Sequence, residues 1–363
     1  MMMGKMSCKF NFSAGPAVLP AEVLKKVQSE LLDWNNTGMS VMEMSHRGKH
    51  FLPLMEKAEN NFRLLLGIPE NYKVLFLQGG AITQNFMVPM NLLNNGTASY
   101  VVSGYWSKRT FNDAQPFNGI NLSASSESVE YKKAPHSSEW KYSKDDAYLH
   151  YCLNETIHGV EFFDEPNIKD VPLVCDMSSN ILSRPINIEN YGVIYAGAQK
   201  NIGPAGLTLL IVRNDLLDVA NKKTPTTFNW KIQSDNNSMI NTPATFSIYV
   251  AGLVFKWILD HGGLESMEAK NIDKATALYS FIDSTDFYYN SIDTSNRSRM
   301  NVSFRIADDS LTSKFVSEAE ENGLYGLKGH RLVGGLRASI YNAMNIDGVT
   351  ALIDFMQRFK ENN

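Results

Sequence analysis

One lysine stands where an apolar segment gives way to a turn rich in glycine and proline. Lys200 follows the segment 195–198 and precedes Asn201-Ile202-Gly203-Pro204. A lysine at the end of a buried strand carries a free-energy penalty unless its amine is hydrogen-bonded or reacting. Such an amine can form a Schiff base with an aldehyde cofactor. A solvated lysine in a loop would show the same spacing.

Two other segments also place polar or flexible residues directly after apolar strands. Asp176 ends the run Val174-Cys175, at the strand end where open α/β sheets bind ligands, and an aspartate there can keep a pyridine nitrogen protonated. Gly79-Gly80 follows an apolar strand and precedes a helix, whose free N–H groups suit a phosphate. A capped turn and a plain strand-to-helix connection are the ordinary alternatives.

Trp106 and Thr156 complete a set of five strand ends. An aromatic ring at Trp106 can stack on a flat ligand, and the Thr156 hydroxyl can bond a ring oxygen or a phosphate. A core tryptophan and a helix cap are the commoner fates of such residues. Taken together, Gly80–Ile82, Trp106, Thr156, Asp176 and Lys200 predict one pocket at the ends of successive strands of one sheet.

The elements that must position these residues alternate along the chain. Continuous apolar runs predict strands covered on both faces, hence an α/β fold with a large domain over 17–262. Residues 1–16 and 263–363 are expected to form a smaller α+β domain. The strands are expected at 73–77, 99–103, 147–153, 172–176, 192–196, 206–212 and 301–306. The helical segments are expected at 21–34, 51–66, 84–93, 246–261, 264–284, 311–322 and 347–359. The serine-rich stretch 123–128 is expected to be a loop or a sheet edge.

Longer motifs resemble the phosphoserine aminotransferase family, among the fold-type I pyridoxal-phosphate enzymes. The resemblance covers most of the chain, from about Phe10 to Phe359. It implies a large domain with a mostly parallel seven-stranded sheet covered by helices, and pyridoxal 5′-phosphate as the cofactor. The motifs are NFSAGPA at 11–17, MSHR at 44–47, NETIHGVEF at 154–162, VCDMSSN at 174–180, YAGAQKNIGPAG at 195–206, NTPATFSIY at 241–249 and LKGHRLVGGLRASIYNA at 327–343.

The resemblance also assigns roles to the cofactor-binding residues. It implies that Lys200 forms the Schiff base and shuttles a proton, and that Asp176 pairs with the pyridine nitrogen. Trp106 would stack on the ring and Thr156 would bond its hydroxyl. The phosphate would be held by Ala81 and Ile82, through backbone N–H, by Gln199, and by Asn241 and Thr242 of a neighbouring subunit. A homodimer with shared active sites follows from that last pair.

Five cation-capable residues are candidates for substrate binding. The resemblance implies that L-glutamate donates an amino group to 3-phosphohydroxypyruvate, and arginine forks suit both carboxylate and phosphate. Solvated surface positions are the ordinary alternative for such doublets. The candidates are His46, Arg47, His330, Arg331 and Arg337.

Two residues depart from common family forms. A polar residue is frequent at the position of Ile82, and serine is expected at the position of Leu332.

Composition excludes several other classes of protein. The 363 residues carry 34 Lys+Arg and 38 Asp+Glu, a net charge of −4, which speaks against nucleic-acid binding. The chain lacks an apolar run of about 20 residues, so no membrane span is expected. Cys8, Cys152 and Cys175 form no CxxC pair, and we expect no metal site and a cytoplasmic location.

Four alternatives to the phosphoserine aminotransferase family remain. Within the fold these are an alanine–glyoxylate type transaminase and a cysteine desulfurase, although a desulfurase needs a mobile nucleophilic cysteine. A non-catalytic scaffold with the same fold would not need Lys200 and Asp176. A nicotinamide dehydrogenase is disfavoured because no GxGxxG follows the first strand.

Overall fold

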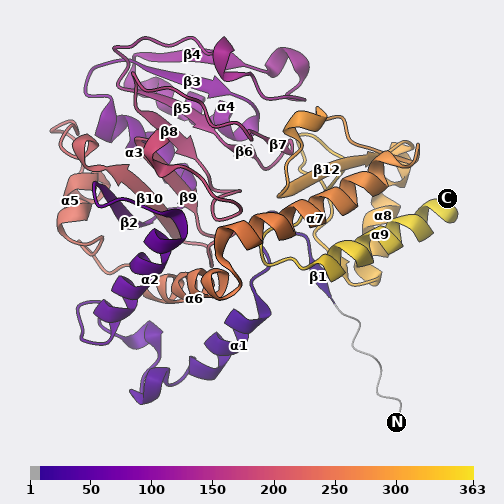
Figure 1. Cartoon of the computed structure of the whole chain (residues 1–363), viewed down its shortest axis with the longest axis horizontal. Helices are drawn as coiled ribbons and strands as arrows, with labels where there is room; N and C mark the ends of the chain where they lie inside the picture. Colours follow the sequence, from indigo (N-terminus) through magenta and orange to yellow (C-terminus); the bar gives the residue numbers. More distant parts are fainter. Residues whose placement is uncertain (1–8) are drawn as a thin grey trace.

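The computed structural model describes residues 9–363, so residues 1–8, with Cys8 and the predicted start of the small domain, lie outside the described residues. A seven-stranded sheet with the order β2-β10-β9-β8-β5-β3-β4 forms the centre of the larger lobe (Figure 1). Only β10 runs antiparallel to its neighbours, which confirms the mostly parallel sheet. The strands are β2 (Tyr72–Gln78), β3 (Ala98–Val102), β4 (Ile120–Ser125), β5 (Tyr148–Cys152), β8 (Leu173–Asp176), β9 (Val193–Gly197) and β10 (Leu207–Arg213).

Six of the seven strands lie within two residues of their predicted positions. The seventh, β4, was not predicted as a strand, although its region was expected to be a loop or an edge. It is one of the two edge strands of the sheet, and Asn121 and Leu122 on it are exposed. An edge strand with a solvated face lacks the continuous apolar run that marks the buried strands.

Alternate residues of the strands bury against different layers of helices. On β2, Val74 and Phe76 join one apolar cluster and Leu75 joins another. Helices α1 (Ala21–Glu30), α2 (Phe51–Leu66) and α6 (Thr245–Asp260) contribute to the first cluster; α3 (Ala81–Leu92), α4 (Tyr105–Ala114) and α5 (Trp230–Asp235) contribute to the second. None of these helices, nor any other in residues 9–363, is long and apolar enough to cross a membrane.

Two helix predictions need correction, and two helices were not predicted. The helix expected over 21–34 ends at Glu30, and Asn35 beyond it has a left-handed φ of 49°, a conformation that asparagine tolerates. The helix expected from Gln84 begins three residues earlier, so Ala81 and Ile82 form its first turn. Helices α4 and α5 were not predicted at all.

The second lobe is built from the C-terminal third of the chain and the N-terminal segment. Strand β1 (Phe10–Asn11) pairs in parallel with β13 (Leu324–Tyr325), and Phe12 is buried in the apolar cluster of this lobe. This packing supports the predicted small domain, whose boundary after residue 262 stays a prediction. The remaining elements are α7 (Gly263–Asp283), β11 (Tyr288–Tyr289), β12 (Asn301–Ile306), α8 (Thr312–Glu321), β14 (Leu336–Ser339) and α9 (Ile346–Glu361).

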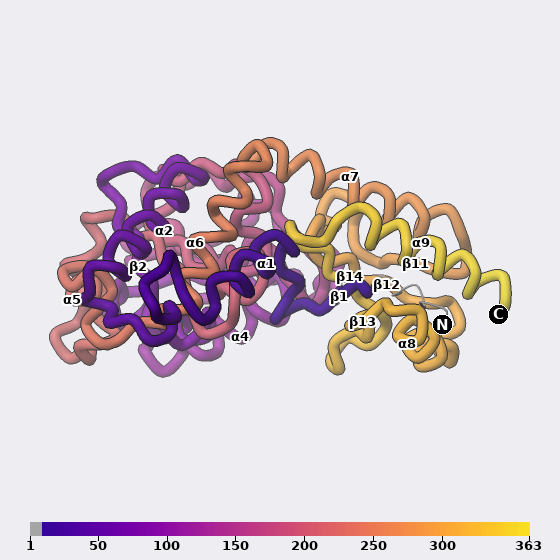
Figure 2. The backbone as a smooth tube through the Cα atoms, turned by 90° about the horizontal axis from the view of Figure 1, so that it is seen from below, coloured from indigo at the N-terminus to yellow at the C-terminus, as the bar shows by residue number. Residues whose placement is uncertain are grey.

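Helix α7 connects the two lobes. It begins next to α6 and runs beside α9 across the three-stranded sheet β11-β12-β14 (Figures 1 and 2). A short hairpin of β6 (Asn154–Glu155) and β7 (Val160–Glu161) projects from the large sheet toward the small one. The carboxyl ends of the parallel strands therefore face a region bounded by elements of both lobes.

The buried histidine on β5 makes stability depend on pH. His150 is fully buried, its Nε2 lies 2.9 Å from the Tyr195 hydroxyl, and burial lowers its pKa to about 3. The folded protein favours the neutral form of His150. The stabilisation that this adds to the free energy of unfolding is therefore complete above pH 6.5 and is lost as the pH falls toward 3.

We expect the His150→Phe variant to have a flatter pH profile of stability than the parent protein. In the parent protein His150 takes up a proton on unfolding, so the free energy of unfolding should fall by about 2 kcal/mol between pH 7 and pH 5 through this residue alone. Urea unfolding at pH 7, 6 and 5 measures the difference between the two proteins. Parallel profiles would contradict the assignment.

Candidate active site

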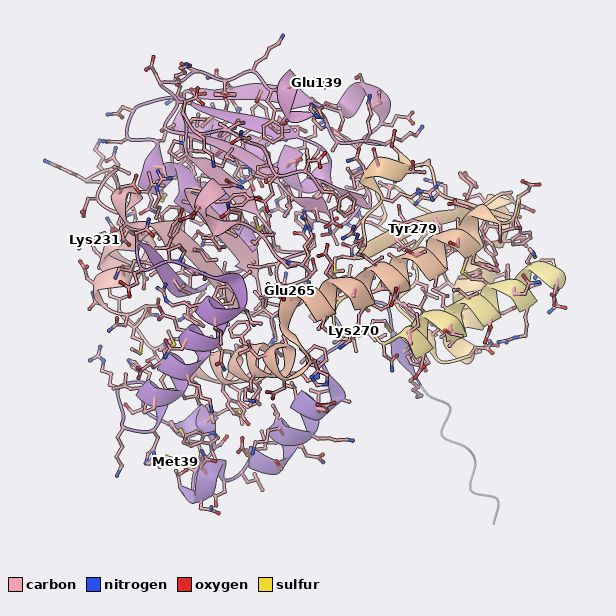
Figure 3. The ribbon with its side chains drawn as sticks, viewed as in Figure 1. Met39, Glu139, Lys231, Glu265, Lys270 and Tyr279 are labelled. Atoms are coloured by element: carbon pink, nitrogen blue, oxygen red, sulfur yellow. The ribbon has the colours of Figure 1, made fainter. Side chains whose placement is uncertain are left out.

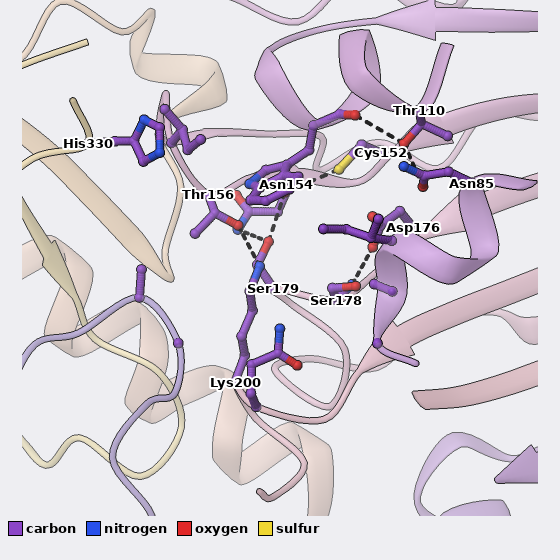
Figure 4. A pocket seen from close by; sticks show the side chains of 18 of the residues that line it. Asn85, Thr110, Cys152, Asn154, Thr156, Asp176, Ser178, Ser179, Lys200 and His330 are labelled. Carbon is purple, nitrogen blue, oxygen red and sulfur yellow. Dashed lines mark hydrogen bonds between the residues drawn. The ribbon is translucent and has the colours of Figure 1, made fainter. Parts of the chain in front are cut away.

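A cavity of about 320 Å³ opens at the carboxyl ends of the parallel strands (Figure 4). The strand ends predicted to converge all contribute to it, from β2, β3, β5, β8 and β9. Four residues of the second lobe, Ala14, Gly15, His330 and Arg337, also line it. Of the residues singled out in the sequence, those lining the cavity are Ala81, Ile82, Trp106, Thr156, Asp176, Gln199, Lys200, His330 and Arg337.

The Lys200 amine lies inside this cavity. Its Nζ donates a hydrogen bond to Thr156 Oγ1 at 2.7 Å and lies 6.0 Å from the centre of the Trp106 ring. Burial lowers the pKa of Lys200, while the nearby Asp176 carboxylate acts in the opposite direction. The amine is therefore more readily neutral than an ordinary lysine, as a nucleophile or a base requires.

Asp176 ends β8 on the other side of the cavity from His330 (Figure 4). Its Oδ1 accepts a hydrogen bond from the Ser178 N–H at 2.8 Å. Burial raises the pKa of Asp176, and both Ser178 and Lys200 lower it in part. A buried carboxylate of this kind favours a cationic N–H group as its partner.

The turn Gly79-Gly80 brings the start of α3 to the cavity wall. Both glycines have left-handed φ values, 100° and 75°, and a Cβ on Gly79 would lie 2.3 Å from Thr83 Oγ1. Gly80 precedes α3 and has no side chain, and in the described part of the chain no side chain caps the first-turn N–H groups. Free N–H groups and the positive end of a 12-residue helix suit an anion.

Three buried polar atoms around the cavity have no partner among the described residues. They are Trp106 Nε1, Asn154 Oδ1 and Arg337 Nε. A flat ligand with a phosphate, a ring nitrogen and a ring hydroxyl matches the α3 terminus, Asp176 and Thr156. Pyridoxal phosphate therefore fits the donors and acceptors present.

Two cation-capable residues enter from the second lobe. Arg337 lies on β14, and its Nη1 donates to the Thr156 carbonyl at 3.4 Å. The His330 ring packs against Tyr105 at 5.8 Å between centres. Burial lowers the pKa of His330, and the charges of Arg337 and Arg331 lower it further.

Five predicted site residues do not line this cavity. Arg331, Asn241 and Thr242 are exposed, although the Thr242 carbonyl accepts a hydrogen bond from Gln78 at the end of β2. The other two are His46, which is half-buried, and Arg47, which is exposed. Met39, in the same connection, lies at the margin of the large lobe beyond α1 and α2 (Figure 3).

Sequence reasoning missed several lining residues. Thr110 lies on the unpredicted α4, and Asn85 accepts its hydroxyl at 3.1 Å. Asn154, Ser178 and Ser179 were quoted only as parts of motifs, and the motif around Asp176 was the signal that pointed to the two serines. Cys152 was considered only as one of three cysteines. Residues 9–363 contain no cluster of three or more His, Cys, Asp or Glu side chains arranged to hold a metal ion.

We expect Asp176→Asn to lower the pKa of Lys200 further, because the carboxylate favours the ammonium form. The test is the pH dependence of acylation of Lys200 by an amine-selective reagent, followed by peptide mass mapping of protein freed of small molecules. An exposed lysine such as Lys73 serves as the reference in the same digest. A midpoint that stays in place or moves upward would contradict the electrostatic coupling.

Comparisons with known proteins agree with this geometry. The class-V aminotransferase family model matches residues 9–352. The chain is 56% identical to a phosphoserine aminotransferase of Hahella chejuensis over 98% of this chain and 99% of that protein. The solved phosphoserine aminotransferase of Bacillus circulans subsp. alkalophilus has a TM-score of 0.96 at 46% identity, covering 98% of this chain and 99% of that chain.

A second solved structure contains a coenzyme. It is the pyridoxal-phosphate-bound phosphoserine aminotransferase of Trichomonas vaginalis, with a TM-score of 0.90 at 42% identity, covering 96% of this chain and 100% of that chain. Likeness at this identity over nearly the full length of both chains concerns the whole molecule, including the elements around the cavity. The chain belongs to the class-V aminotransferases, within their phosphoserine aminotransferase family.

Proposed function

We propose that this chain is a pyridoxal-phosphate-dependent transaminase that passes the amino group of L-glutamate to 3-phosphohydroxypyruvate. The products are 2-oxoglutarate and O-phospho-L-serine, a precursor of L-serine. The observation that carries the proposal is the meeting of Lys200, Asp176 and Thr156 in one cavity with the uncapped start of α3. The family to which the chain belongs supports the same reaction.

The cavity offers a separate partner for each part of the coenzyme. Ala81 and Ile82 would hold the phosphate through backbone N–H groups, together with the Gln199 side chain. Asp176 would accept the pyridine N–H, and Thr156 would bond the ring hydroxyl. Trp106 would cover one face of the ring. When bound, pyridoxal phosphate supplies an electron sink for the bond broken at the substrate α-carbon.

Lys200 is the residue we assign to proton transfer. Its amine lies in the cavity with a lowered pKa, so it can take the proton that leaves the substrate α-carbon. The Thr156 hydroxyl, 2.7 Å away, orients it. The base, Lys200, and the proposed contact to the ring hydroxyl, Thr156, therefore lie side by side.

Arg337 and His330 are the residues of this chain that we assign to substrate binding. A phosphorylated keto acid presents a carboxylate and a phosphate, and glutamate presents two carboxylates. A guanidinium fork binds either anion bidentately, and the buried Nε of Arg337 has no partner within residues 9–363. Arg331 follows His330 in the sequence and is exposed, but it does not line the cavity.

The desulfurase alternative is disfavoured by the state of its candidate thiol. Cys152 lines the cavity, but its thiol is buried and burial raises its pKa well above the ordinary value. A thiol held in the protonated form on a central strand is a poor nucleophile. Cys175 is buried as well.

His46, Arg47, Asn241 and Thr242 lie outside the cavity of their own chain. We infer that they reach the active site of a second copy of this chain, as a homodimer with shared active sites requires. The position of Thr242 beside Gln78, next to the phosphate-binding turn, supports an interface at this edge. A cytoplasmic location stays a prediction.

We expect the absorbance spectrum of purified protein to report both coenzyme and substrate. The purified protein should be yellow, and O-phospho-L-serine and L-glutamate should each convert its bound coenzyme to the aminated form. L-serine and L-alanine, which lack the second anionic group, should leave the spectrum unchanged.

Other spectral outcomes would each remove part of the proposal. A yellow protein that responds to L-alanine and ignores phosphoserine would discard the substrate and retain the transaminase. A colourless protein that cannot be reconstituted with pyridoxal phosphate would favour the non-catalytic scaffold.

Shared active sites predict complementation between two inactive variants. Lys200→Ala removes the base from one chain, and His46→Ala combined with Arg47→Ala removes the cations offered to the other. If the sites are shared, re-associated mixtures in equal amounts should recover about a quarter of the parent activity, because half of the dimers carry one intact site. Mixtures of each variant with itself are the control. No recovery despite exchange of subunits would show that His46 and Arg47 do not act across the interface.

A further inference from the structure

The helix that carries Trp106 begins without a cap of its own. Gly104 precedes α4, and it has no side chain to accept from the first N–H groups of the helix. Unpaired N–H groups at a buried helix start cost free energy unless another element satisfies them. The partner must therefore come from elsewhere in the chain.

A buried carboxylate from the β6–β7 hairpin takes this role. Glu155 is fully buried; its Oε2 accepts the Trp106 N–H at 2.9 Å and its Oε1 accepts the Ser107 N–H at 2.8 Å. The Ser107 hydroxyl also donates to Oε1, at 2.6 Å. Burial raises the pKa of Glu155, whereas the hydrogen bonds from Ser107 and Trp106 act in the opposite direction, and a negative charge at this end is also favoured by the helix dipole.

The third N–H of the helix start is taken by the same hairpin. His158 Nδ1 accepts the Tyr105 N–H at 3.3 Å. Burial lowers the pKa of His158 to about 4, so the ring is neutral at neutral pH and this nitrogen can accept. Residues 155 and 158 thus satisfy three consecutive donors of α4.

The backbone at Gly104 is shaped around this carboxylate. A Cβ on Gly104 would lie 2.5 Å from the Glu155 carboxyl carbon, so no larger residue fits while Glu155 stays in place. This close approach is an observation separate from the hydrogen bonds. It shows that the space beside Gly104 is filled by the Glu155 carboxylate.

Glu155 and its neighbour in sequence serve opposite sides of the same wall. Thr156 faces the cavity and accepts from Lys200, whereas Glu155 does not line the cavity and points to α4. The Trp106 ring lies in the cavity wall, 6.0 Å from the Lys200 amine. One backbone segment therefore sets the position of both the lysine contact and the aromatic face.

We propose that Glu155 is a positioning residue that holds Trp106 against the coenzyme by capping α4 from the β6–β7 hairpin. This inference rests on the proposed function of Trp106 as the residue that covers the coenzyme ring. Glu155 itself touches neither coenzyme nor substrate.

The test is the holoenzyme of the Glu155→Gln variant, which keeps the size of the side chain and removes its charge. A glutamine can accept with only one of its two terminal atoms, so one helix N–H loses its partner. We expect the coenzyme dissociation constant to rise roughly tenfold to a hundredfold. The visible circular dichroism of the bound coenzyme should weaken, because the stacked ring is displaced.

A double-mutant cycle with Trp106→Phe separates positioning from general stability. If Glu155 acts through Trp106, Glu155→Gln should change the dissociation constant less than about threefold in the Trp106→Phe background. Full additivity would overturn the proposal, as would a folded Glu155→Gln protein with unchanged affinity and dichroism. If Trp106→Phe alone has no effect, the proposed role of Trp106 fails instead.

Glu161 provides a matched control on the same hairpin. It is also a buried carboxylate, and it accepts from Asn180 Nδ2 at 3.1 Å and from the Arg299 N–H at 3.0 Å, away from the cavity. We expect Glu161→Gln to lower the melting temperature and to leave coenzyme affinity within about twofold. An equal loss of affinity in this control would count against a specific role for Glu155.

A milder variant keeps the test valid if Glu155→Gln does not fold. Ser107→Ala removes one donor to the Glu155 carboxylate, together with the acceptor of the Ser103 and Gly104 N–H groups, and leaves both backbone bonds to Glu155. We expect the same direction of change in affinity and dichroism, with a smaller size. If both variants fold, unchanged coenzyme affinity and dichroism in both would overturn the proposal. If only Ser107→Ala folds, unchanged affinity and dichroism in that variant would overturn it.

Discussion

The active site depends on keeping the Lys200 amine withdrawn from water at the edge of a buried sheet. Burial lowers the pKa of this amine, and the Asp176 carboxylate opposes that shift without contacting it directly. An amine in this balance is available both as a nucleophile and as a base. The covered faces of the sheet supply the low-dielectric surroundings, and the adjacent strand ends supply the partners.

The same constraint explains how the two lobes are joined. Asn201, directly after Lys200, accepts the Asn342 N–H at 3.0 Å, and Asn342 in turn accepts from Asn271 on α7 at 2.9 Å. All three side chains are buried. Arg337 comes from the same segment as Asn342. Buried polar side chains that are hydrogen-bonded to one another favour one arrangement over its alternatives, so the position of Arg337 is tied to that of Lys200.

Helix starts carry much of the chemistry in this fold. The start of α3 is left uncapped and is therefore free for an anion, whereas the start of α4 is capped by Glu155. One places free N–H groups in the cavity, and the other fixes an aromatic ring. The difference arises because Gly80 faces the open cavity, while Gly104 lies against a buried carboxylate.

Local signals in the sequence determined six of the seven strands of the large sheet, most helices and the lysine, aspartate and glycine turn of the site, because apolar runs and turn residues act over a few positions. Longer motifs carried the family and, with it, the coenzyme. Helix α4 escaped prediction because its cap, Glu155, lies 49 residues from Trp106 and 48 residues from Ser107 in the sequence. Only the tertiary structure decided that Arg337 and His330 reach the cavity while His46 and Arg47 do not, since those placements follow from the packing of distant elements.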